Sequence, residues 1–95
     1  MISSTNDIVF MTEAINMAKE GLLLGEVPIG AVVTYDNKII GRGFNQNIKN
    51  SDPTAHAEII ALREASSYLN NYRLNGCNLY VTIEPCLMCF GACIH

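Results

Sequence analysis

Apolar residues recur at intervals of three and four near the start of the chain. They are Met11, Ala14, Ile15, Ala18 and Leu22. This spacing places their side chains on one face of an α-helix, so the pattern predicts a helix over about residues 7–24. Asn6 or Asp7 can cap the start of this helix, and Gly25 can end it.

The next segments alternate between extended patterns and turn residues. Residues 29–35 are apolar and β-branched, Asp36-Asn37-Lys38 forms a turn signal, and residues 39–44 resume an extended pattern. Together they predict a β-hairpin. Gly41 and Gly43 weaken its second strand or bring another backbone close to it.

A polar loop over residues 45–52 precedes a second helical pattern. We expect Asp52 to cap this helix and Pro53 to occupy its first position. Its apolar face comprises Ile59, Ile60, Leu62, Ala65 and Leu69. After Asn75-Gly76, alternation over residues 79–83 predicts a third strand, and Glu84-Pro85 begins a third helix. The order helix, strand, strand, helix, strand, helix indicates a layered α/β fold.

Composition narrows the classes of protein that this chain can represent. The 95 residues are 49% hydrophobic and 16% charged, which is typical of one globular domain. No apolar run approaches the roughly 18 residues of a membrane span, and the start lacks the pattern of a signal peptide, so we expect a cytoplasmic location. The net charge of −3 provides no overall attraction for nucleic acid.

Two short motifs carry the candidate chemistry. His56-Ala57-Glu58 is followed later by Pro85-Cys86-Leu87-Met88-Cys89. One imidazole and two thiolates give three zinc ligands, and a catalytic zinc site has three protein ligands and one open position. Alone, the cysteine pair could instead be a redox pair or buried sulfur. In combination with His-x-Glu, it is typical of zinc-dependent nucleobase deaminases. Cys77 and Cys93 fit small buried side chains better than a disulfide or a fourth ligand.

The spacing of these residues suits hydrolysis. Cys86 and Cys89 are three apart at a predicted helix start, where the macrodipole favours thiolates. His56 and Glu58 are only two apart, so they can cooperate only if the metal lies beyond the end of their helix. Zinc lowers the pKa of a bound water, and Glu58 can then act as the proton carrier.

The chain resembles the TadA-type tRNA adenosine deaminases of the cytidine deaminase-like superfamily. The resemblance runs from the first helix to the last residue. It rests on Gly25-Glu26-Val27-Pro28-Ile29-Gly30-Ala31-Val32, Asp52-Pro53-Thr54-Ala55-His56-Ala57-Glu58, Asn71-Tyr72-Arg73-Leu74 and Leu79-Tyr80-Val81-Thr82-Ile83-Glu84-Pro85-Cys86-Leu87-Met88-Cys89. The segment from Asp52 to Glu58 is also similar to bacterial guanine deaminases, whereas the stretch around Glu26 favours the TadA type.

The resemblance implies a three-layer α/β/α fold and a hydrolase that acts on C–N bonds. It implies that one Zn²⁺ per chain is bound by His56, Cys86 and Cys89, and that Glu58 is the catalytic proton shuttle. Asn45 falls on the position that hydrogen-bonds the target nucleoside, and Ile29 on the position that packs against the flipped base. The reaction implied converts adenosine to inosine at the wobble position of a tRNA anticodon loop, in a homodimer.

The family pattern continues beyond His95 with further strands and helices. We therefore expect residues 1–95 to be a single, C-terminally incomplete CMP/dCMP-type deaminase domain, with its third strand at an exposed sheet edge. Two other functions remain open at this point. One is deamination of a free base or nucleotide of the guanine or cytosine type, and the other is a non-catalytic zinc-binding fragment.

Overall fold

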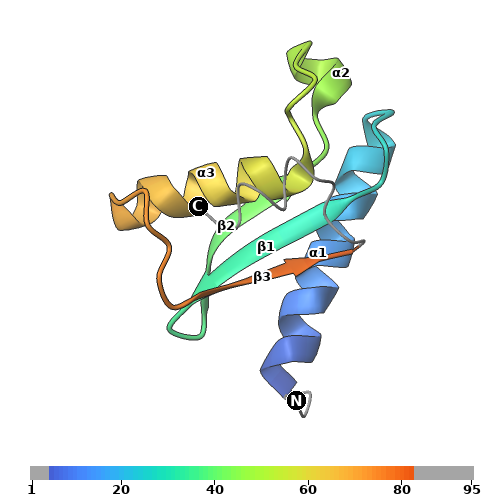
Figure 1. Ribbon diagram of the computed structural model, residues 1–95. Coiled ribbons are helices and arrows are strands. Elements are labelled where there is room, and N and C mark those ends of the chain that lie inside the picture. The colour runs from blue at the N-terminus through green and yellow to red at the C-terminus, as the bar shows by residue number, and fades with distance from the viewer. Residues whose placement is uncertain (1–4, 83–95) are drawn as a thin grey trace.

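A computed structural model describes residues 5–82 of the chain (Figure 1). The elements follow in the order α1 (Thr5–Leu23), β1 (Gly30–Tyr35), β2 (Lys38–Phe44), α2 (Asn47–Asn50), α3 (Ala57–Leu69) and β3 (Cys77–Val81). The predicted first helix, hairpin, second helix and third strand are all present. The predicted third helix, beginning at Glu84-Pro85, lies outside the described residues. None of the helices in the described range is long and apolar enough to cross a membrane.

The three strands form one antiparallel sheet in the order β2-β1-β3. Asp36 and Asn37 form the tight hairpin turn with φ values of 51° and 64°, a left-handed conformation that short polar side chains tolerate. The register shifts between Val33 and Thr34, which pair with Gly41 and Ile39 respectively. The intervening Ile40 is therefore the extra residue of a β-bulge.

Helices cover both faces of the sheet, which confirms the three-layer α/β/α architecture (Figure 1). Ala31 and Val33 of β1 belong to the core cluster that packs against α3, whereas Val32 packs against α1. All three side chains are essentially inaccessible to solvent. Because neighbouring strand residues point to opposite faces, β1 contributes to both halves of the core.

The buried face of α1 differs from the prediction. Ala14 and Ala18 are buried as expected, together with Phe10, but Met11, Ile15 and Leu22 are exposed. Small residues dominate this face because the helix lies very close to the sheet. A Cβ atom at Gly30 would come within 2.0 Å of the Ala14 carbonyl oxygen. Gly25 ends the helix as predicted, with a φ of 79°.

The start of α3 also differs from the prediction. The helix begins at Ala57 with His56 as its N-cap, so Asp52 is not the cap and Pro53 is not the first helical residue. The Asp52 carboxylate instead accepts hydrogen bonds from the Thr54 N–H and hydroxyl groups, both at 2.8 Å. This local turn competes with helix formation and delays it by four residues.

Alanines and glycines bring α3 against β2. Ala57, Ala61 and Ala65 are fully buried, while the larger predicted residues Ile59, Ile60, Leu62 and Leu69 are only partly buried. A Cβ atom at Gly41 would lie 2.2 Å from the Ala61 carbonyl oxygen, and one at Gly43 would lie 2.3 Å from that of Ala57. The expectation that these two glycines allow close backbone approach is therefore confirmed.

Side chains of β3 complete both halves of the core. Leu79 and Val81 pack against the cluster beneath α3, and Tyr80 faces α1. The Tyr80 ring lies 5.4 Å from the Phe10 ring, and its hydroxyl group donates a hydrogen bond to Asp7. Cys77 is half-buried against the same core, and burial raises the pKa of its thiol. Cys93 lies outside the described residues.

Candidate active site

The start of α3 carries His56 and Glu58. His56 has an extended backbone (φ −80°, ψ 153°), and its carbonyl oxygen accepts a hydrogen bond from the Ile60 N–H at 3.0 Å. Glu58 lies in the first helical turn and is only 4% exposed. Backbone N–H groups at a helix start favour a negative charge there. His56 thus lies at the N-terminal end of α3, which is where its side chain must be to reach a metal beyond that end.

Asn45 connects this helix start to the beginning of β1. Its side-chain Oδ1 accepts a hydrogen bond from the Ala57 N–H at 2.9 Å, and its own N–H donates to the Ile29 carbonyl oxygen at 3.2 Å. Asn45 is 6% exposed, and Ile29 is half-buried. The structure therefore brings Ile29, Asn45 and the segment from His56 to Glu58 together. Oδ1 accepts one hydrogen bond from Ala57, and the two Nδ2 donors form no hydrogen bond within residues 5–82, so the Nδ2 amide is a group that Asn45 can offer a ligand.

The loop between Asn45 and His56 is held by hydrogen bonds along its length. The Gln46 N–H donates to the Ala55 carbonyl oxygen at 2.8 Å, and Asn47 Nδ2 donates to the Asp52 carbonyl oxygen at 2.9 Å. The Thr54 backbone N–H, followed by its hydroxyl group, lowers the pKa of the Asp52 carboxyl. These bonds fix the backbone that leads into His56.

The end of β3 lies at the same end of the sheet. The Thr82 N–H donates to the Gly30 carbonyl oxygen at 3.1 Å, and the Gly30 N–H donates to Thr82 Oγ1 at 3.2 Å. Gly30 directly follows Ile29, so the described part of the chain ends close to the Asn45 backbone contact. The strand order β2-β1-β3 thus gathers the end of β2, the start of β1 and the end of β3.

The two predicted cysteine ligands, Cys86 and Cys89, lie outside the described residues. Over residues 5–82, no three His, Cys, Asp or Glu side chains are grouped to hold a metal ion. The one described member of the predicted donor set, His56, is compatible with zinc, because its half-buried imidazole belongs to the residue at the N-terminal end of α3.

Sequence reasoning gave no role to one buried residue near the site. Glu26 is 4% exposed, and its carboxylate accepts hydrogen bonds from the Ile48 N–H at 3.2 Å and the Lys49 N–H at 2.8 Å. The available signal was a single charge within the otherwise apolar run from Leu22 to Ile29. Such an isolated charge between a helix and a buried strand suggests a carboxylate with fixed partners.

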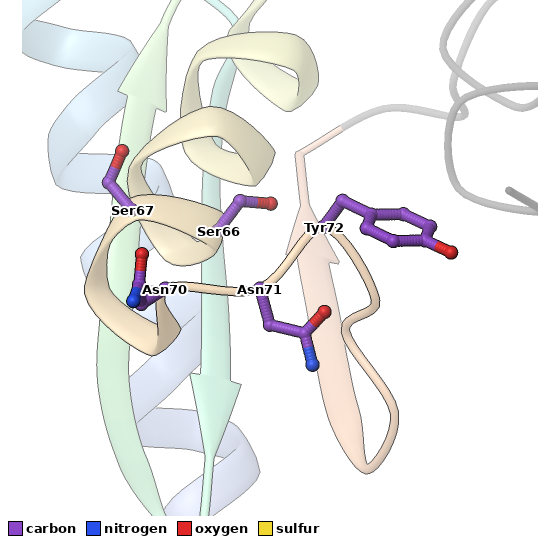
Figure 2. A pocket seen from close by; sticks show the side chains of 5 residues that line it. All are labelled: Ser66, Ser67, Asn70, Asn71 and Tyr72. Carbon is purple, nitrogen blue, oxygen red and sulfur yellow. The ribbon is translucent and has the colours of Figure 1, made fainter.

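A surface hollow lies at the other end of α3 (Figure 2). It is lined by Ser66, Ser67, Asn70, Asn71 and Tyr72. Ser66, the lining residue nearest to His56 in the sequence, follows it by ten residues, a distance of about 15 Å along the helix. Tyr68 and Tyr72 are exposed, and the Arg73 guanidinium lies 5.6 Å from the centre of the Tyr72 ring. These residues are not part of the candidate active site.

Comparison with known proteins relates the chain to deaminases. The tRNA-specific adenosine deaminase of Buchnera aphidicola subsp. Baizongia pistaciae is 57% identical over 90 residues, which cover 95% of this chain and 56% of that protein. A structure of guanine deaminase from Bacillus subtilis has a TM-score of 0.88 and 43% identity, covering 92% of this chain and 56% of that one.

A second solved structure comes from work on A-to-I editing by tRNA:A34 deaminases at the wobble position of transfer RNA. It has a TM-score of 0.84 and 45% identity, and covers 86% of this chain and 63% of that one. The chain spans 55–62% of the length of three relatives named tRNA-specific adenosine deaminase. The family model for the cytidine and deoxycytidylate deaminase zinc-binding region matches residues 4–95. Since this match includes nearly every residue, the chain belongs to the family of cytidine and deoxycytidylate deaminase zinc-binding proteins.

Proposed function

We propose that this chain supplies the zinc site and the proton-transfer residue for deamination of adenosine to inosine at the wobble position of a tRNA anticodon. The observation that carries the proposal is the buried Glu58 in the first turn of α3, two residues after the N-cap His56. The relatives named tRNA-specific adenosine deaminase support this reaction over others in the family.

His56, Cys86 and Cys89 would hold one Zn²⁺ per chain. An imidazole and two thiolates form a three-ligand donor set of the kind found in catalytic zinc sites. When bound, zinc acts as a Lewis acid that makes water a strong nucleophile at neutral pH. Thiolate ligands need a reducing compartment, which supports a cytoplasmic location for the reaction.

Glu58 would carry the protons of the reaction. Its carboxylate takes a proton from the water whose oxygen forms a bond with C6 of adenine, and it passes this proton to N1 of the ring. It then transfers the remaining water proton to the amino group, the C6–N bond breaks, and ammonia leaves. The products are inosine and ammonia, and Glu58 returns to its carboxylate form.

Asn45 and Ile29 would bind the target nucleoside. The Asn45 Nδ2 amide is a hydrogen-bond donor held in place by the bond from Ala57 to Oδ1. Ile29 adds a half-buried apolar side chain at the start of β1, against which a base can pack. A base from an anticodon loop reaches such a site readily, because loop bases are easily unstacked.

The direct test is incubation of the zinc-loaded protein with an anticodon stem-loop that carries adenosine at the wobble position. Inosine is measured by mass spectrometry of the digested RNA, and ammonia by a coupled assay. Glu58→Gln should retain one zinc per chain and lose about 10²- to 10⁴-fold in rate. Glu20→Gln, at an exposed position on α1, is the matched control and should behave like wild type. A Glu58→Gln variant with full activity would exclude the proposed role of Glu58.

A second candidate is deamination of free guanine. The TM-score of 0.88 with guanine deaminase from Bacillus subtilis specifically favours it. Parallel reactions with guanine and with cytosine nucleotides distinguish these substrates from RNA. Full zinc content without product from any of them would favour the remaining alternative, a non-catalytic zinc-binding fragment.

We also propose that the active form is a homodimer. A dimer would present contact residues of two subunits to one RNA, and a chain with a net charge of −3 has no overall attraction for RNA, so it depends on such local contacts. Light scattering on the eluting protein should give twice the chain mass of 10.4 kDa. A monomeric mass at the concentrations used for the activity assay would contradict this.

A further inference from the structure

The short helix α2 is capped by a residue from a distant part of the chain. Its own N-cap, Gln46, makes no side-chain capping hydrogen bond. The N–H groups of Ile48 and Lys49 instead donate to the carboxylate of Glu26, which lies between α1 and β1. The first N–H groups of a helix have no partner within the helix, so a carboxylate at this end stabilises it.

These hydrogen bonds stabilise both the buried Glu26 carboxylate and helix α2. Glu26 is 4% exposed, and burying a carboxylate is unfavourable unless hydrogen bonds replace its hydration. Two N–H groups provide such bonds, which are stronger than neutral ones because the acceptor is charged. A helix of four residues is not stable alone, so α2 depends on tertiary contacts of this kind.

The backbone groups that Glu26 binds belong to the same short segment as Asn45. The carbonyl oxygen of Ile29 holds the Asn45 N–H, and the carboxylate of Glu26 holds the N–H groups three and four residues further on. The segments 26–29 and 45–49 are therefore joined at both ends. Loss of the Glu26 contact would release one end of the segment that carries Asn45.

We infer that Glu26 is a positioning residue. It clamps the segment 45–49 and so fixes the direction in which Asn45 presents its Nδ2 amide to a bound nucleoside. This inference rests on the proposed function of Asn45. It assigns Glu26 no contact with substrate and no proton transfer.

Glu26→Gln tests the clamp with little change in side-chain size. One acceptor oxygen becomes an NH₂ group that faces a backbone N–H, so one hydrogen bond is lost. We expect amide hydrogen exchange at Ile48 and Lys49 to accelerate about tenfold or more. The KM for the anticodon stem-loop should rise by a similar factor, because a misaligned Asn45 amide binds the nucleoside less well. The kcat should stay within about threefold of wild type, because Glu58 and the predicted zinc ligands are unchanged.

Two further variants complete the experiment. Glu26→Asp keeps the charge but shortens the reach, so its exchange rates and KM should lie between those of wild type and Glu26→Gln. If Glu26→Gln does not fold, Glu26→Asp carries the same comparison. Glu20→Gln is the matched control on an exposed part of α1 and should change neither measurement.

The possible results separate the two proposals. Unchanged exchange at Ile48 and Lys49 would overturn the clamp. Faster exchange with an unchanged KM, or a fall in kcat at constant KM, would overturn the positioning role. If the wild-type protein deaminates no RNA, the proposed function fails, and the exchange measurement still decides whether Glu26 holds the loop.

Discussion

At the scale of single residues, the two buried glutamates differ in their surroundings. The Glu26 carboxylate is compensated by two backbone N–H groups. Glu58 is equally buried, yet it forms no ion pair with any residue in the described range. Burial of a carboxylate is unfavourable without hydrogen bonds, so the two N–H groups account for the burial of Glu26. The described contacts therefore give Glu26 a structural role, whereas the proposal for Glu58 rests on its position two residues after His56 in the first turn of α3.

Asp52 provides a prediction about pH. Hydrogen bonds from Thr54 lower the pKa of the Asp52 carboxyl below its usual 3.8. Because the pKa is lower in the folded state, ionised Asp52 stabilises the loop at any pH above the pKa of Asp52 in the unfolded chain. This contribution is lost as the pH falls through the lower pKa of the folded state. The amide resonance of Thr54 should therefore shift on acidification with a midpoint below 3.8.

Asp52→Asn is the matched variant for this measurement. An asparagine can still accept a hydrogen bond from the Thr54 N–H, but it does not ionise. The acid-dependent shift of the Thr54 amide resonance should disappear in this variant. Its persistence would assign the titration to another group.

At the scale of elements, the start of α3 depends on its close approach to β2. A methyl group at Gly43 would meet the Ala57 carbonyl oxygen at 2.3 Å and the Ala61 nitrogen at 2.8 Å. Both atoms belong to helix backbone, which can move only as a unit. The Ala57 carbonyl lies between His56 and Glu58, so displacement of this backbone moves both candidate site residues.

Gly43→Ala should therefore affect both stability and the site. We expect a loss of about 1–3 kcal/mol in the free energy of unfolding, measured by urea denaturation, together with weaker zinc binding. Gly25→Ala is the control, because Gly25 has a φ of 79° but no atom within 4 Å of an added Cβ. It should lose about 1 kcal/mol through backbone strain alone and keep its zinc affinity. Equal zinc affinities in the two variants would contradict this explanation.

The sequence predicted the elements better than it predicted their contacts. Periodicity identified α1, the hairpin, α3 and β3, and the glycines of β2 indicated close approach. The buried face of α1 was assigned partly wrongly, because packing at Gly30 selects Ala14 and Ala18 over the larger Ile15. The start of α3 was placed too early, because the Asx turn at Asp52 depends on side-chain geometry that helix signals do not contain.

At the scale of the whole molecule, the candidate site is assembled from segments far apart in the sequence. Ile29 precedes β1, Asn45 follows β2, His56 and Glu58 begin α3, and Thr82 follows β3. The motifs indicated which residues carry the chemistry, but only the strand order shows why Ile29, Asn45 and Ala57 meet. Glu26 was missed because an isolated charge in an apolar run does not indicate which distant backbone groups it binds, here the N–H groups of Ile48 and Lys49.

A site built from distant segments should couple metal binding to global stability. A metal that binds only the folded state at about 1,000 times its Kd adds about 4 kcal/mol to the free energy of unfolding. For a domain of this size, such a gain corresponds to a rise in Tm of about 15–30 °C. Calorimetry with zinc, and again after chelation, should show this shift and its reversal. His56→Ala should have nearly the same metal-free Tm and little response to zinc, because one predicted ligand is missing. An equal zinc response in this variant would mean that the stabilising metal binds elsewhere.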